Sequence, residues 1–177
     1  MKRSIIAATV ISAVVMSAGV FAADTQDQGK LEIKGKIVGI TCEFIGSNSA
    51  EIILNELGAD KINGLPAGGV YDGVTNSTAV PLKIKCEANK TPRITFSATQ
   101  FDNNDITLNN GDAKGVGFAV YHGDTNTKVD PQTGVSLEKN STGDYELNFL
   151  ARYARNTDAA VESGNVNSTL TLTVVTD

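Results

Sequence analysis

Few residues of this chain are of the types that carry out chemistry, and their spacing does not bring them into one site. The 177 residues include one histidine, His122, two cysteines and no tryptophan. A histidine acts as a general base only beside a positioned partner, and the sequence assigns none to His122. We interpret it as a solvent-facing residue at the turn that ends a strand, and we predict no catalytic residue.

Other patterns match binding motifs only in part. Residues 102–105 read Asp-Asn-Asn-Asp, which is rich in oxygen ligands but lacks the central glycine and final glutamate of a calcium loop. Residues 115–117 read Gly-Val-Gly, without the third glycine and the helix of a dinucleotide site. We interpret the first pattern as a polar turn and the second as the start of a strand, and we predict no metal and no cofactor.

The first 22 residues have the organisation of a secretory signal peptide. Lys2 and Arg3 precede an apolar stretch over residues 5–15, and small residues follow. We expect cleavage between Ala22 and Ala23. A retained membrane anchor is the alternative, since no charge interrupts the stretch, but its alanine, serine, threonine and glycine content favours a signal. No second stretch of this kind follows, so we expect no membrane insertion after processing.

Export bears on the redox state of the two cysteines. In an oxidising compartment, Cys42 and Cys86 have one intramolecular connection available. A bridge that closes a loop of this length stabilises a fold by about 4 kcal/mol in the chain-entropy model. Two free thiols or half of a metal site are the alternatives. We expect a disulfide.

The charge balance excludes another class of function. The chain has 15 basic and 20 acidic residues, a formal net charge of −5, and two of the basic residues leave with the signal. Phosphates of nucleic acids and anionic lipids require a broad cationic surface. We therefore predict no nucleic-acid partner.

The elements that hold these residues are predicted to be strands. Alternating apolar and polar residues, enriched in β-branched types, recur between turns rich in glycine, asparagine and aspartate. Only residues 57–62 favour a short helical turn. The pattern predicts an all-β antiparallel sandwich, with strands at 30–37, 51–54, 79–86, 93–98, 115–121, 145–153 and 168–175.

Both ends of the processed chain carry a clean alternating strand. Neither is interrupted by proline, and an unprotected apolar strand at a sheet edge readily pairs with another chain. The alternative is that the two strands pair inside one domain, and periodicity alone leaves both alternatives open. The apolar positions are Leu31, Ile33, Gly35 and Ile37 at the start, and Leu170, Leu172 and Val174 at the end.

Several motifs, in order along the chain, together resemble a known family. They are the run from Gly29 to Val38 followed by Cys42, Pro81 to Cys86, Gly115 to Val120, Phe149 to Tyr153, and Gly164 to Val166. Over nearly the whole processed chain they resemble the pilin subunits of chaperone-usher fimbriae, in particular the type 1 fimbrial major-subunit family.

The resemblance implies an incomplete immunoglobulin-like β-sandwich, the pilin fold, which lacks its final strand and leaves an apolar groove. Residues 1–22 would be the signal peptide, 23–36 an N-terminal donor-strand extension and 37–177 the pilin domain. In the family, a periplasmic chaperone lends a strand to the groove. The extension of the next subunit then replaces that strand at an outer-membrane usher.

Residue roles follow from the same resemblance. Gly29, Leu31, Ile33 and Gly35 match the donor strand, with Leu31 and Ile33 filling the groove of a neighbour. The terminal strand gripped by the chaperone corresponds to Leu170, Leu172 and Val174, together with the carboxylate of Asp177. The chain departs from the family at Thr176, where a penultimate tyrosine is usual.

The function implied is a structural subunit of a bacterial surface fimbria, polymerised by donor-strand exchange and supporting cell adhesion. Its partners would be other pilin subunits, most simply copies of itself, together with the chaperone and the usher. It would pass through the periplasm to the cell surface. A minor adaptor pilin is the first alternative. A free-standing secreted carbohydrate-binding module and an exported enzyme around His122 are the others.

Overall fold

The computed structural model describes residues 29–37, 42–73, 76–77, 80–87, 90–123 and 127–176. Within these ranges nearly all regular structure is β. The elements are β1 (Gly29–Ile37), β2 (Cys42–Ile45), β3 (Ser49–Leu54), α1 (Ala59–Asn63), β4 (Asn76–Ser77), β5 (Leu82–Cys86), β6 (Pro92–Phe96), η1 (Ala98–Gln100), β7 (Val116–His122), β8 (Val135–Ser136), β9 (Tyr145–Leu147), β10 (Phe149–Arg155) and β11 (Val166–Thr176).

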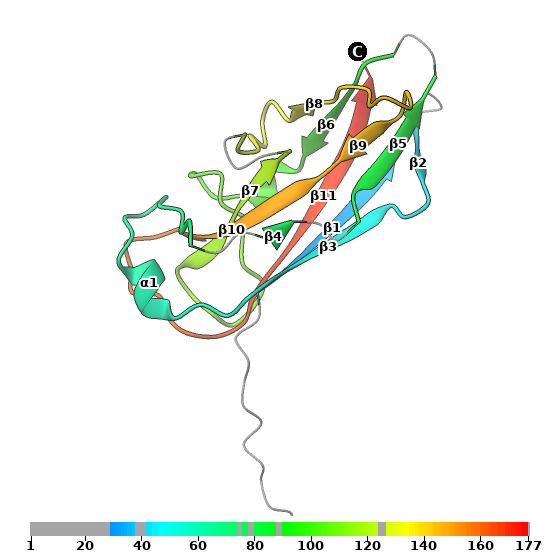
Figure 1. Cartoon of the computed structure of the whole chain (residues 1–177). Coiled ribbons are helices and arrows are strands. Elements are labelled where there is room, and N and C mark those ends of the chain that lie inside the picture. The colour runs from blue at the N-terminus through cyan, green and yellow to red at the C-terminus, as the bar shows by residue number, and fades with distance from the viewer. Residues whose placement is uncertain are drawn as a thin grey trace, which may run out of the picture.

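The strands form two layers that enclose one main core. One layer is a five-stranded sheet in the order β3-β1-β11-β6-β8, and the other contains the three-stranded sheets β4-β10-β7 and β2-β5-β9. In Figure 1, β10 and β9 cross in front of β11. The prediction of an all-β sandwich is confirmed.

Alternation along the strands fills the space between the layers. Buried and more exposed residues alternate along β3 and along most of β11, as expected for strands with one face on a core. Phe96 contacts Phe149 and Phe101 edge to face, with ring centroids 5.9 and 6.1 Å apart. These aromatic contacts, together with the aliphatic side chains of both layers, form the main core.

Strand β7 is buried on both faces. One face contributes to the main core, and the other packs in a small second cluster made of Ile106, Ala119, Tyr121 and Ala154. The segment before β7 reaches it so closely that a Cβ on Gly117 would lie 2.2 Å from the carbonyl oxygen of Thr107. A glycine is required there because no side chain fits at that distance.

The structure corrects some predicted bounds. The strand predicted at 145–153 is two strands, because the chain changes sheets at Asn148: β9 pairs with β5 and β10 pairs with β7. Strand β2 was not predicted, since four residues are too few to show an alternation. The helical turn predicted near 57–62 is α1.

Candidate functional site

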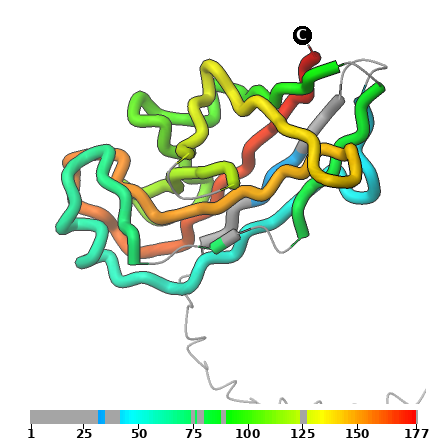
Figure 2. Tube along the Cα trace, turned by 45° about the horizontal axis from the view of Figure 1, so that its top comes forward, coloured from blue at the N-terminus to red at the C-terminus, as the bar shows by residue number. Residues whose placement is uncertain are grey.

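The two terminal strands of the described chain lie side by side. Strand β1 occupies the space between β3 and β11, antiparallel to the first and parallel to the second. In Figure 2 the short blue part of its trace lies between the cyan trace of β3 and the red trace of β11. Of the alternatives that periodicity left open, the structure has the pairing within one chain. We call the groove between β3 and β11, which β1 fills, the seam.

Among the side chains of β1 that the structure describes, Ile33 anchors the strand in the seam. It lies opposite Leu170 of β11 and Ala50 of β3, and it is completely buried. Full burial of an aliphatic side chain of this size contributes about 1.5–3 kcal/mol relative to exposure. A polar side chain at this position would lie opposite the apolar Leu170 and Ala50, so the position favours an apolar residue.

The other predicted donor-strand residues occupy the same seam. Gly29 lies opposite Val166, Leu31 opposite Ser168, and Gly35 opposite Leu172. Their role in a second chain stays a prediction, because one chain supplies both sides here.

The predicted acceptor strand forms one wall of the seam. Leu170 and Leu172 are fully buried and Val174 nearly so, with exposed fractions of 0%, 0% and 4%. Thr176 pairs with Pro92 of β6, which places the end of β11 inside the sheet. Asp177 and the predicted cleavage site at Ala22 and Ala23 lie outside the described residues.

The opposite wall was not assigned a role from the sequence. Strand β3 contributes Ala50, Ile52 and Leu54, all buried, and its backbone pairs with β1 from Gly29 to Lys34. The pattern of residues 51–54 predicted most of this strand, which begins at Ser49, but nothing in it indicated its partner. Alternation within a strand is a local pattern, so it does not show which distant segment the strand pairs with.

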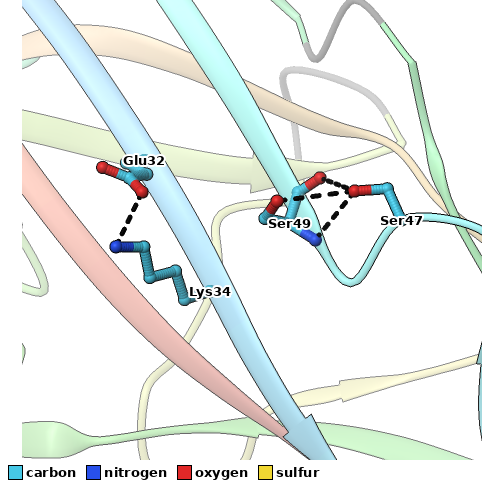
Figure 3. A network of polar contacts seen from close by, with 4 residues as sticks. All are labelled: Glu32, Lys34, Ser47 and Ser49. Carbon is cyan, nitrogen blue, oxygen red and sulfur yellow. Dashed lines mark hydrogen bonds and ion pairs between the residues drawn. The ribbon is translucent and has the colours of Figure 1, made fainter.

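The outward face of the seam is polar. Lys34 Nζ lies 2.8 Å from a carboxylate oxygen of Glu32 two residues earlier, as Figure 3 shows. Glu32 also lies opposite Glu51 of β3, and like charges directly across a strand pair are unfavourable. At the start of β3, the Ser49 amide donates to Ser47 Oγ at 3.2 Å, and Ser47 Oγ donates to the Ser49 carbonyl at 2.7 Å. These exposed groups contribute little to holding β1.

A disulfide fixes the chain close to where β1 ends. Cys42 and Cys86 are bonded with an S–S distance of 2.07 Å and lie directly opposite each other in the β2–β5 pair. The pairing predicted from the cysteine count is present. Cys42 follows Ile37 after residues 38–41, which lie outside the described part of the chain. The body of the domain is therefore held covalently beside a strand that is held only by noncovalent contacts.

The residues considered for catalysis or ligand binding take part in packing, in a turn and at the start of a strand. His122 is half-buried, which corrects the solvent-facing interpretation: its ring packs edge to face against Phe149, with centroids 5.7 Å apart. Asp102 Oδ1 accepts hydrogen bonds from the amides of Asn104 and Ile106 at 2.8 and 3.0 Å. This closes the predicted polar turn at 102–105. Gly115 lies just before β7, where a strand start was predicted.

The described part of the chain holds neither a cluster of metal-binding side chains nor a membrane-spanning helix. No group of three or more histidine, cysteine, aspartate or glutamate side chains there is arranged to hold a metal ion. Nor is any helix among those residues both long and apolar enough to cross a membrane.

Comparison with known proteins identifies the family to which this chain belongs. The chain matches the fimbrial protein family over residues 31–176, which includes β3, β11 and most of β1. It belongs to the fimbrial protein family. Across its whole length it is 36% identical to the fimbrial-like protein YehD of Escherichia coli (strain K12), all of which is covered. The sandwich is thus the immunoglobulin-like pilin fold, and the chain is a fimbrial subunit that assembles with other pilin subunits into a surface appendage.

Proposed function

We propose that the chain is a shaft subunit of a bacterial fimbria that supports cell adhesion and is polymerised by donor-strand exchange. In the fibre, β1 of one copy fills the groove between β3 and β11 of the next. The donor residues are Gly29, Leu31, Ile33 and Gly35, and the acceptor residues include Leu170, Leu172 and Val174.

The observation that carries this proposal is the position of β1 in the sheet. Among the described strands, β1 alone lies between β3 and β11, and it pairs with both. If it left, the groove would expose Ile52, Leu170 and Leu172, which are fully buried now. A strand of the same sequence from another copy offers the same backbone ladder and the same isoleucine.

Such a groove requires protection before assembly. An apolar groove with two unpaired strand edges aggregates readily, so we propose a periplasmic chaperone that lends a strand, and an outer-membrane usher where the exchange takes place. The division into signal 1–22, extension 23–36 and domain 37–177 belongs to the same proposal. In the isolated chain, β1 in its own groove is the resting arrangement, and exchange must replace it.

Peptide capture by the full-length oxidised chain tests the proposal. A fluorescent peptide of residues 23–36 is incubated with the protein just below its unfolding midpoint, where the resident β1 opens often. Two matched variants of the peptide carry Ile33→Ser, on the buried face, and Lys34→Ser, on the exposed face.

We expect the native and Lys34→Ser peptides to form complexes that survive gel filtration, and the Ile33→Ser peptide to form none. A buried serine would lack both apolar contact and hydrogen-bond partners at that depth. Failure to capture the native peptide, or equal capture of the Ile33→Ser peptide, would contradict the proposal.

A further inference from the structure

The two edges of β11 are covered in different ways. On one edge, β1 pairs with β11 from Val166 to Val174. On the other edge, β6 pairs only with Leu172 to Thr176. Residues 166–171 of β11 therefore have no strand beside them on that second edge, within the described part of the chain. Backbone groups of a buried strand need hydrogen-bond partners, so other groups must serve here.

Asn109 supplies one set of these partners. Its Oδ1 accepts hydrogen bonds from the amide of Asn167 in β11 and from the amide of Gly111, both at 2.8 Å. Its Nδ2 donates to the carbonyl of Ala113 at 2.7 Å, which holds the side chain in place. The amide of Asn110 adds a hydrogen bond of 2.7 Å to the carbonyl of Asn167.

Gln100 supplies the second set, at Thr171, four residues further along β11 than Asn167. Its Oε1 accepts from the amide of Thr171 at 2.8 Å, and its Nε2 lies 3.4 Å from Thr171 Oγ1 as a donor. Gln100 is the last residue of η1, and its carbonyl accepts from the amide of Leu108 at 2.9 Å. The two side chains thus come from one connected segment, residues 100–109.

This segment is anchored to the core independently of β1. Thr107 is fully buried, its amide donates to the carbonyl of Phe118, and its Oγ1 accepts from the amide of Phe118 at 3.0 Å. Ser168 of β11 donates to the carbonyl of Leu108 at 2.8 Å, and its Oγ lies 2.8 Å from Thr107 Oγ1. None of these bonds involves β1, so its departure breaks none of them.

We propose that Gln100 and Asn109 take the place of a strand along this edge of β11, and that they keep β11 extended when β1 leaves the seam. This inference rests on the proposed donor-strand exchange and names its positioning residues. They touch the wall of the groove, not the incoming strand. A wall already extended spares the incoming strand the entropic cost of ordering it.

Amide hydrogen exchange of the full-length chain, resolved by residue, tests this inference. The amides of Glu32 and Ile33 report the opening of β1, and those of Asn167 and Thr171 report the braced edge. We expect the braced amides to exchange at least about tenfold more slowly than the β1 amides, because they need a second, rarer opening. Equal rates in the two groups would overturn the inference, since the wall would then dissolve as β1 leaves.

Two variants of one side chain separate bracing from general stability. Gln100→Met keeps the length but removes the acceptor, and it should speed exchange at Thr171 by about tenfold, up to the rate of the β1 amides. Gln100→Glu keeps an oxygen for the Thr171 amide and should leave that rate within about twofold of wild type. An unchanged Thr171 rate in Gln100→Met would overturn the inference.

The outcome is separable from that of the proposed function. If the wild-type chain captures no peptide of residues 23–36, donor-strand exchange is wrong, whatever the exchange rates at Asn167 and Thr171. If the peptide is captured but those rates equal the rates of β1, donor-strand exchange stands and the brace does not.

Discussion

Strand β1 and the next strand along the chain, β2, are held by different kinds of force. Strand β2 forms four residue pairs with β5, and one of them is the covalent bond between Cys42 and Cys86. Strand β1 forms nine residue pairs with β11 and six with β3, with no covalent link to either. The longer strand has more backbone pairing, and the proposed donor-strand exchange nevertheless requires it to leave. On that proposal, exchangeability comes from the lack of a covalent link, not from weak contact.

Under the same proposal, the difference separates a fixed part of the fold from an exchangeable one. The disulfide fixes the chain a few residues beyond β1, so opening of the seam need not spread into β2 and β5. Strand β11 borders both parts of the fold. One of its edges pairs with β1, and the other is bound to β6 and to the segment around Gln100.

Removal of the disulfide should have the largest effect on stability. Replacement of both Cys42 and Cys86 by serine should lower the free energy of unfolding by about 4 kcal/mol, because the unfolded chain regains the freedom of the closed loop. Urea unfolding of the oxidised wild type and of the double variant measures this loss. A midpoint shared by both proteins would show that the covalent region is not the fixed part of the fold.

The next largest effect should come from the seam. Ile33→Ala leaves a cavity at a fully buried position and should cost about 3 kcal/mol in the stability of the β1 contact. Trypsin should then cut after Lys34 and Lys36 faster than in wild type, while the disulfide-linked body resists. Lys34→Ala is not a suitable control because it removes a trypsin site, so Thr169→Ala, on the outward face of β11, serves instead. Cleavage spread evenly over the chain would contradict separate opening of β1.

A smaller effect is expected from the hydroxyl pair behind the seam. Ser168→Ala removes the donor to Leu108 and leaves the buried Thr107 hydroxyl with one partner fewer, which should cost about 1–3 kcal/mol. Thr169→Ala, the neighbour on the other face of β11, should cost less. If both variants unfold at the same urea concentration, the buried pair does not stabilise the wall.

Acid should weaken the start of β11 slightly. The amide of Asn165 donates to Asp112 Oδ1 at 2.5 Å, and this bond lowers the pKa of Asp112 below its ordinary value of 3.8. A lowered pKa in the folded state gives stability that is present above pH 3.8 and is lost as the pH falls through the folded pKa. Asp112→Asn should therefore lose less stability than wild type on acidification, as measured by urea midpoints. Parallel curves for the two proteins would show that Asp112 contributes nothing to this acid sensitivity.

Much of the architecture is predictable because it is local. The alternation from Lys30 to Ile37 and from Ser168 to Val175 predicted both seam strands within two residues of their observed ends. Strand β2 and the short strands β4 and β8 were missed, because two to four residues carry too little periodicity.

The pairing of strands was beyond the sequence. Ile33 and Leu170 are 137 positions apart, and nothing in either pattern indicates that they meet or that the strands run parallel. Gln100 and Asn109 lie in segments without periodicity, and their role depends on the length of β6, which stops at Phe96. Side chains that replace a strand become visible only once the unfilled edge is known.

Cysteine trapping between chains tests most directly whether β1 is an exchangeable part of the fold. One population carries Lys34→Cys in β1, and each of three others carries one added cysteine on β11, Thr169→Cys, Thr171→Cys or Thr173→Cys, with the native disulfide kept in all of them. They are mixed under assembly conditions and oxidised. Donor-strand exchange predicts disulfide-linked pairs of the two chains, strongest at one of the three positions and abolished by adding Ile33→Asp to the donor. A control chain carries both Lys34→Cys and Thr171→Cys and reports pairing within one chain. Cross-linking within this control, with none between chains in the mixtures, would contradict donor-strand exchange.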